Sequence, residues 1–352
     1  MNGHRSEASL FDAAIESAAV FNWVAAECAV TGNLLDALPE LSTPDDLMAR
    51  LGFHPAKRDA LDALLRVLVD LRLAERRTDP VAGDVYRARP GAVAERRALS
   101  GGIERYRPRL DRLAPWYGDR HVDLIREANR HLLGDDLSFF RDPGTKIRFE
   151  RPYFDAWRAN LTNPLYEFGR VLAVRELAER GRRFLDLACG MGYGAQRLAE
   201  LAGLGTEVVC VDISQDMLDE ARRQGYPADA SVRFVRRDLN TGLPPLPAGS
   251  YDGVLFNGAL HFVEDKPARL AEIHRALRPG GLLAVGHCFC RSGFADEPMH
   301  DLYFSLVENR SWITTFGELR TIVADAGFEE LREYHRGSHS YLLAERLAEP
   351  AA

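Results

Sequence analysis

The segment FLDLACGMGYGA places an acid and three glycines within one short stretch of the chain. An apolar run ends at Asp186, and Gly190, Gly192 and Gly194 follow it before a helix-like segment. Gly190, Gly192 and Ala195 match the G-x-G-x-x-G/A loop, in which backbone amides and a helix N-terminus hold the pyrophosphate of a dinucleotide. Asp186 with the three glycines instead fits a cofactor that carries no phosphate. The loop alone therefore leaves the cofactor open.

Three evenly spaced acids separate these two interpretations. Asp186, Asp212 and Asp238 each end a predicted strand, so in a parallel sheet they gather along one rim. A pyrophosphate beside Asp186 would be repelled by about 4 kcal/mol at a separation of about 4 Å and an effective dielectric of about 20. An α-ammonium and a sulfonium would be attracted there, while Asp212 can accept from ribose hydroxyls and Asp238 from an adenine amino group. The acids favour S-adenosylmethionine over NAD.

These acids must be positioned by alternating strands and helices, which follow residue 181. Near-continuous Val, Leu and Phe runs indicate strands buried on both faces, and the alternation predicts a doubly wound, mainly parallel sheet with its ligand at the carboxyl ends of the strands. The predicted strands are 183–188, 207–213, 232–238, 252–257 and 282–289. The predicted helices are 193–201, 215–224 and 266–277.

The first ninety residues predict a smaller helical module. Residues 9–30 form an Ala-rich helix with more apolar surface than a lone surface helix carries, so a second subunit is expected to cover it. A helix beginning at Ser42 or Thr43 and ending at Gly52, a helix over 55–71 and two short strands then predict a winged helix. Apolar side chains on nearly every face of the second helix, and basic ones offset by acids, favour dimerisation over DNA binding.

Residues 90–170 are rich in aromatic side chains and proline. Aromatics in such a connecting stretch pack between domains, and some of them can line an apolar ligand pocket. Four basic residues of this stretch have two interpretations: they form a solvated face, or they contact a carboxylate or phosphate of the substrate. They are Arg141, Lys146, Arg148 and Arg151.

The composition of the chain limits its partners and location. A formal net charge of −7 and a pI near 5.9 give no electrostatic footprint for nucleic acid or an anionic membrane, which favours a small-molecule partner. The five cysteines include no C-x-x-C pair, and most of them are expected to be buried thiols in a reducing compartment. No signal peptide or membrane span is recognisable, so a cytoplasmic protein is expected.

Five ordered segments resemble the class I S-adenosylmethionine-dependent methyltransferases: FLDLACGMG, VVCVDIS, VRFVRRDLN, YDGVLFNGALHF and IHRALRPGGLLAV. The resemblance implies a Rossmann-like sheet of seven strands, S-adenosylmethionine as cofactor and S-adenosylhomocysteine as product. Ala188 departs from it, because a glycine is common at that position. The cofactor contacts that the resemblance implies are Asp186, Ala188, Gly190, Gly192, Asp212, Ile213, Met217, Asp238, Leu239 and Asn257.

The N-terminal module narrows the resemblance to the dimeric small-molecule O-methyltransferases of secondary metabolism, which include enzymes of antibiotic biosynthesis. It implies a homodimer and three regions: a helical arm with a winged-helix dimerisation domain (1–95), an aromatic linker lining the substrate pocket (96–165) and a catalytic domain (166–352). The expected substrate is a small, aromatic, secondary-metabolite-type molecule.

Two histidines near strand ends are candidates for proton transfer. His261 follows the fourth strand, where the resemblance places a general base, but Phe262 stands where that family has an acid. His261 therefore has a second interpretation, as a packing residue, and Asp265 is a candidate to orient it. His287 closes the fifth strand and has either a catalytic role or only a hydrogen-bonding one.

O-methylation with His261 as base is the first prediction. C-methylation, next to a keto acid for example, is the alternative, with His261, Asp265 and His287 around Fe²⁺ or Zn²⁺ as a variant that is not favoured. A winged-helix regulator that only senses a ligand is a third possibility.

Overall fold

The computed structural model describes residues 22–92, 130, 133–134, 136–143, 151, 154–162, 164–289, 293–294, 297–306, 315–337 and 339–347. The predictions for the helix before residue 22, for most of the aromatic linker, and for Lys146, Arg148 and Cys290 lie outside the described residues. The chain divides into two compact units. One comprises Met1–Arg148, Asp155–Leu165 and Ala295–Arg310, and the other comprises Phe149–Phe154, Tyr166–Phe294 and Ser311–Ala352.

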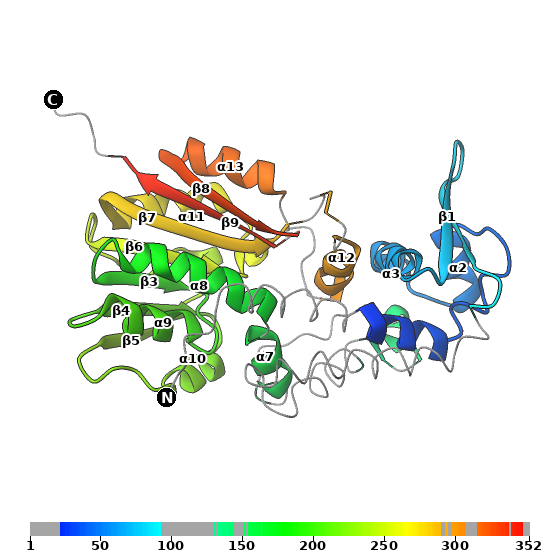
Figure 1. Cartoon of the computed structure of the whole chain (residues 1–352), viewed down its shortest axis with the longest axis horizontal. Coiled ribbons are helices and arrows are strands. Elements are labelled where there is room, and N and C mark those ends of the chain that lie inside the picture. Colours follow the sequence, from blue (N-terminus) through cyan, green and yellow to red (C-terminus); the bar gives the residue numbers. More distant parts are fainter. Residues whose placement is uncertain are drawn as a thin grey trace. The chain divides into compact units, whose positions relative to one another are not determined.

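The first unit is mostly helical (Figure 1). Its helices are residues 22–31, α2 (Pro44–Leu51), α3 (Arg58–Asp70), α7 (Phe154–Leu161) and α12 (Glu297–Leu306), and its strands β1 (Ala74–Asp79) and β2 (Gly83–Ala88) form an antiparallel pair. Short 3₁₀ helices cover Pro55–Lys57 and Ser138–Arg141.

The ends of α2 follow from local sequence. The Thr43 side chain accepts from the Asp46 amide while the Asp46 carboxylate accepts from the Thr43 amide, which is a capping box. Gly52 ends the helix at φ 64°, in the left-handed region that favours glycine. The start at Thr43 and the end at Gly52 confirm the sequence-based prediction for this helix.

The helix over residues 22–31 is covered by its own chain. Val24, Ala26 and Ala29 are fully buried, and Ala25 and Cys28 nearly so. This part of the predicted apolar helix therefore needs no second subunit to cover it.

Helix α12 packs against α3, although α12 comes more than 200 residues later in the sequence. Arg66 of α3 is paired with Asp62 on its own helix, and with Glu297 and Asp301 on α12, at N–O distances of 3.2, 3.5 and 2.5 Å. The side chain of Arg66 is only 19% exposed. The part of the polar face of α3 that carries Arg66 is thus occupied within the chain.

The second unit is built on a seven-stranded sheet with the strand order β5-β4-β3-β6-β7-β9-β8 (Figure 1). The pairings from β5 to β7 are parallel, and β9 is antiparallel to both β7 and β8. The predicted doubly wound, mainly parallel sheet is confirmed. The strands are β3 (Arg183–Leu187), β4 (Glu207–Asp212), β5 (Ser231–Arg236), β6 (Tyr251–Asn257), β7 (Leu277–Cys288), β8 (Phe328–Arg336) and β9 (His339–Arg346).

Apolar side chains bury both faces of this sheet. Helices α8 (Pro164–Ala178) and α9 (Tyr193–Ala202) pack on one face, together with Leu255 and Leu343. Helices α11 (Lys266–Ala276) and α13 (Phe316–Asp325) pack on the other, together with Phe256 and Leu342. Helix α10 (Gln215–Ala221) follows β4. Successive residues of one strand therefore belong to different cores, as the period of a β-strand requires.

One strand end differs from its prediction. The sequence places Asp238 at the end of the third strand, but β5 ends at Arg236, which is paired with Asp212. Asp238 instead caps the 3₁₀ helix Leu239–Thr241, where its side chain accepts from the Asn240 amide at 2.9 Å. An aspartate that bonds the backbone two residues ahead competes with strand pairing.

Among the described residues, no helix is both long and apolar enough to cross a membrane.

Candidate cofactor and catalytic site

The loop between β3 and α9 surrounds a buried acid. Asp186 is 3% exposed, and its carboxylate accepts a hydrogen bond from the Ala195 amide in the first turn of α9. The backbone approaches it closely at Gly194, where an added Cβ would lie 2.7 Å from Oδ2 of Asp186. Within the described part of the chain, this buried Oδ2 has no hydrogen-bond partner. Such an oxygen can accept from a cationic donor on a ligand.

The surroundings of Asp186 oppose its ionisation. Burial raises the pKa of Asp186 to about 7, against the attraction of Arg170 and the bond from Ala195, while the charge of Asp212 raises it further. A positively charged ligand group would favour the ionised form. Asp186 therefore fits the α-ammonium and sulfonium of S-adenosylmethionine and does not fit a pyrophosphate.

Three residues of this loop have left-handed backbone angles: Ala188 (φ 51°), Gly190 (φ 53°) and Gly192 (φ 82°). Glycine adopts this conformation freely, whereas a residue with a Cβ is strained in it. That strain explains why a glycine is common at the position of Ala188. At Gly192, a Cβ would also lie 2.6 Å from the Tyr226 hydroxyl oxygen.

Asp212 joins this loop to the next one. It ends β4, is 8% exposed, and accepts from the Gly190 amide at 2.9 Å and from the Ser214 amide at 2.8 Å. Each carboxylate oxygen has two lone pairs, so both oxygens retain the capacity to accept from ribose hydroxyls. Of the two predicted cofactor contacts that follow, Ile213 is 53% exposed and Met217 is buried.

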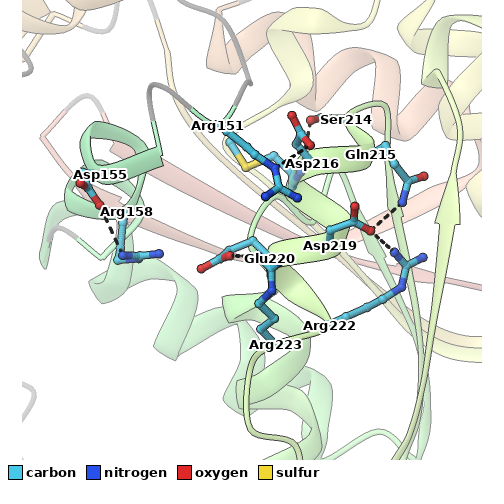
Figure 2. Close-up of polar contacts among 11 residues, drawn as sticks. Arg151, Asp155, Arg158, Ser214, Gln215, Asp216, Asp219, Glu220, Arg222 and Arg223 are labelled. Carbon is cyan, nitrogen blue, oxygen red and sulfur yellow. Dashed lines mark hydrogen bonds and ion pairs between the residues drawn. The ribbon is translucent and has the colours of Figure 1, made fainter.

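Polar side chains of α10 form exposed pairs beside this second loop (Figure 2). Asp216 in its first turn pairs with Arg151 at an N–O distance of 3.2 Å, and Asp219 accepts from Gln215 at 2.8 Å. The side chains of Arg151 and Asp216 are 58% and 39% exposed, so their pairing contributes about 0–1 kcal/mol. Arg151, a candidate contact for an anionic substrate, is held at α10 instead.

The turn after β5 is connected to the segment that carries His261. Leu239 is 9% exposed within that turn. The next residue, Asn240, donates to the Phe262 carbonyl and accepts from the Glu264 amide, both at 2.9 Å. The turn after β5 and the segment that carries the candidate base are therefore fixed relative to each other.

The two candidate histidines are stacked. His261 lies in the 3₁₀ helix Leu260–Phe262 and His287 lies near the end of β7, and they are 4% and 1% exposed. Their ring centroids are 4.4 Å apart, with an interplanar angle of 20°. Burial, together with the charge of Lys266, lowers the pKa of His261 to about 3. The imidazole of His261 is therefore neutral at physiological pH, and its protonated form is disfavoured in the ligand-free protein.

Asp265 has a different environment. It is exposed, and its carboxylate accepts from the Ala268 amide at 2.9 Å as the N-cap of α11. The structure thus gives Asp265 a role in starting a helix. In the described ranges, no group of three or more His, Cys, Asp or Glu side chains is placed to hold a metal ion.

The residue-based prediction missed two side chains next to these groups. Arg170 of α8 is 4% exposed, donates to Glu167 at 2.6 Å, and contributes the largest attraction to Asp186. Tyr341 of β9 is 2% exposed and donates to Asn257 Oδ1 at 2.7 Å. Neither belongs to a recognisable motif, because each reaches the rim only through the packing of distant elements.

Comparisons with known proteins agree with this geometry. The methyltransferase domain family matches residues 185–285. The demethylmenaquinone methyltransferase of Thermus thermophilus is 37% identical over 134 residues, which are 36% of this chain and 60% of that protein. The match thus spans less than two thirds of that relative's length.

Two solved structures are similar over nearly the whole chain. The citrinin polyketide synthase CMeT domain aligns with a TM-score of 0.67 at 15% identity and covers 94% of this chain and 89% of that one. An O-methyltransferase family protein from Burkholderia thailandensis aligns with a TM-score of 0.52 at 18% identity, covering 94% and 95%. At these identities, the similarity concerns the fold.

The strand order, the acid-and-glycine loop and the family match lead to one assignment. Residues 185–285 match the methyltransferase domain family, and the sheet that contains them has the strand order expected of a class I S-adenosylmethionine-dependent methyltransferase.

Proposed function

We propose that this protein transfers a methyl group from S-adenosylmethionine to a small molecule and that His261 removes the proton of the acceptor. The observation that carries the cofactor assignment is the buried Oδ2 of Asp186, which has no partner among the described residues and lies under a loop of small residues. A phosphorylated nucleotide would be repelled there.

Different residues at the rim bind different parts of the cofactor. Asp186 takes the cationic amino-acid part, Asp212 the ribose and the turn after β5 the adenine. When bound, the cofactor supplies a methyl group on an already activated sulfonium. Holding the reactants in line can contribute effective molarities of about 10⁵ to 10⁸ M, so positioning is the main task of these side chains.

His261 is proposed as the base because it follows β6 at the carboxyl ends of the parallel strands, and its imidazole is neutral there. A phenol with a pKa near 10 is only about one part in a thousand ionised at pH 7, and a positioned base typically adds about 10² to 10⁴ to the rate. Negative charge developing on the acceptor would stabilise the imidazolium that forms. The stacked His287 limits the movement of the ring.

A hydroxyl oxygen is the first candidate for the acceptor, because the N-terminal module resembles that of small-molecule O-methyltransferases. A carbon is the second candidate, and the name of one relative favours it: a ubiquinone/menaquinone biosynthesis C-methyltransferase of Syntrophotalea carbinolica is 37% identical over 143 residues. An acidic carbon next to a carbonyl group needs the same proton removal. His261 serves either reaction.

The contacts of α3 argue against the regulator hypothesis. A recognition helix must present a polar, basic face to the major groove. In this chain, that face carries Arg66, which is paired with Asp301 and Glu297 of α12. A homodimer remains part of the proposal through the family resemblance, and light scattering of the purified protein tests it.

Parallel calorimetric titrations with S-adenosylhomocysteine and NADH test the cofactor. We expect binding of the first and no heat of binding with the second; tight binding of NADH alone would overturn the proposal. A gel shift with random-sequence DNA at physiological salt tests the regulator alternative, and tight, salt-sensitive binding would support it.

The acceptor atom needs a second experiment. S-adenosylmethionine with a carbon-13 methyl group is incubated with panels of phenols and of 1,3-dicarbonyl compounds. The carbon-13 shift of the product separates a methoxyl from a C-methyl group, so a C-methyl product would replace the first candidate by the second.

A further inference from the structure

Three neighbouring strands place Asn257, Gly286 and Tyr341 in one row. Asn257 of β6 is the register partner of Gly286 in β7, and Gly286 is the partner of Tyr341 in β9. Because the three residues are paired across the sheet, their Cα–Cβ directions lie on the same face. Gly286 has no side chain, so the tyrosine can extend over it.

The ring of Tyr341 fills the space that two glycines leave. A Cβ on Gly286 would lie 2.0 Å from the ring, and one on Gly169 of α8 would lie 1.6 Å from it. Extending over Gly286, the phenol donates to Asn257 Oδ1 at 2.7 Å. A side chain of this size, held between two backbones, has little freedom to move.

Asn257 belongs to the face of the sheet that carries the cofactor acids. Two residues before it in β6, Leu255 is the register partner of Asp186 in β3. Side chains two residues apart on a strand point to the same face, so Asn257 lies one step closer to the carboxyl ends than Leu255 on the Asp186 face. Asn257 is half-buried, which leaves part of its amide accessible to a ligand.

We propose that Tyr341 is a positioning residue: its hydroxyl fixes the Asn257 amide so that Nδ2 donates to an oxygen or nitrogen acceptor on the bound cofactor. The inference rests on the proposed function, since it places the cofactor at this rim. The phenol holds Oδ1 on its own side of the amide, so Nδ2 is the end of the amide turned away from Tyr341 and offered to the ligand. Burial raises the pKa of Tyr341, which keeps the hydroxyl protonated and donating.

Calorimetric titration with S-adenosylhomocysteine tests this role, with urea unfolding as the parallel measurement. Tyr341→Phe keeps the ring and removes one hydrogen bond, and we expect about 3- to 10-fold weaker binding. Asn257→Asp should bind more weakly than Asn257→Ala, because the carboxylate still accepts from Tyr341 but presents an acceptor where a donor is needed.

The double variant Tyr341→Phe/Asn257→Ala separates positioning from general stability. If Tyr341 acts through Asn257, the double variant binds no more weakly than Asn257→Ala alone. The matched control is Tyr334→Phe in β8, whose hydroxyl bonds to Glu176 at 2.9 Å, and its affinity should equal that of the wild type.

Each outcome is decisive for the inference. If the wild type binds S-adenosylhomocysteine and Tyr341→Phe binds it with the same affinity, the role of Tyr341 is overturned and the proposed function stands. Additive losses in the double variant show that Tyr341 does not act through Asn257 and also overturn it. A wild-type protein that does not bind S-adenosylhomocysteine overturns the proposed function, and the inference with it.

Discussion

Two acids at opposite ends of the same sheet have opposite environments. At the amino end of β6, Asp252 accepts from the Arg182 and Arg183 amides at 2.8 and 2.9 Å and from Arg278 Nε at 2.6 Å. Burial opposes its ionisation, but the bonds from Arg278 and the two amides outweigh burial and lower the pKa of Asp252. At the carboxyl ends, Asp186 is more deeply buried, and its pKa is raised to about 7.

The difference separates a structural acid from a binding acid. The chain satisfies Asp252 with its own donors, so that carboxylate ties the backbone of Arg182 and Arg183 and the side chain of Arg278 to the start of β6. It leaves Oδ2 of Asp186 without a donor in the described residues, although such burial is unfavourable. In the proposed function, a cationic ligand supplies the missing interaction, and Asp186 contributes to binding at the expense of the stability of the ligand-free protein.

The largest effects on cofactor affinity and on stability are expected when each acid is replaced by its amide. Asp186→Asn removes the charge that meets the cofactor's ammonium. Loss of one partner of a buried charged pair costs about 3–5 kcal/mol. S-adenosylhomocysteine should therefore bind at least about a hundredfold more weakly. Asp252→Asn should keep wild-type affinity and lose about 2 kcal/mol of unfolding free energy, because charge-assisted hydrogen bonds are weakened. Calorimetry and urea unfolding measure both variants, and equal affinities would refute the distinction.

A second pair of variants extends the comparison to histidines. His261→Ala should lower turnover by at least about a hundredfold with unchanged affinity for S-adenosylhomocysteine, because it removes a base and no cofactor contact. His274→Ala, in the last turn of α11 and before the amino end of β7, is the control and should keep normal turnover. Near wild-type turnover in His261→Ala would assign that residue to packing.

The pH dependence of cofactor binding sharpens the same comparison. The ionised form of Asp186 binds the cation, so affinity for S-adenosylhomocysteine should rise about eightfold from about pH 6 to about pH 7.5, as Asp186 loses its proton near pH 7. Titrations at several pH values measure this slope, and Asp186→Asn should abolish it. A slope that persists in the variant would assign the proton to another group.

The two acids also have opposite effects on stability. The raised pKa of Asp186 contributes stability that is present below its unfolded pKa of about 3.9 and is lost as the pH rises through about 7. The lowered pKa of Asp252 contributes stability that is present above about 3.9 and is lost as the pH falls through its folded pKa. At about pH 8, Asp186→Asn should therefore stabilise the ligand-free protein, and urea unfolding measures the gain.

The smallest expected effect concerns the backbone of the loop. Ala188→Gly relieves the strain of a Cβ at φ 51°, and the unfolding free energy should rise by about 0.5–1 kcal/mol with unchanged affinity for the cofactor. Thermal and urea unfolding test this. A destabilised variant would show that the Cβ of Ala188 makes contacts worth more than the strain.

Local patterns were enough to predict much of this molecule. Residue spacing predicts both ends of each parallel strand to within two residues, except that β7 begins five residues before its predicted start. It also predicts the start and end of α2. It also places Asp186 and Asp212 at the rim, because the acid that follows an apolar run lies where the run ends. Asp238 was misplaced by two residues, since its side chain can cap a turn as well as follow a strand.

The strand pattern by itself determined which residues share a face, and so which acids border the cofactor loop. Only the tertiary structure decided which of them kept an oxygen without a donor, where α12 packs, and that Tyr341 reaches Asn257 across Gly286. The physical reason is that alternation along a strand is local, whereas burial and strand register depend on contacts between segments far apart in the chain.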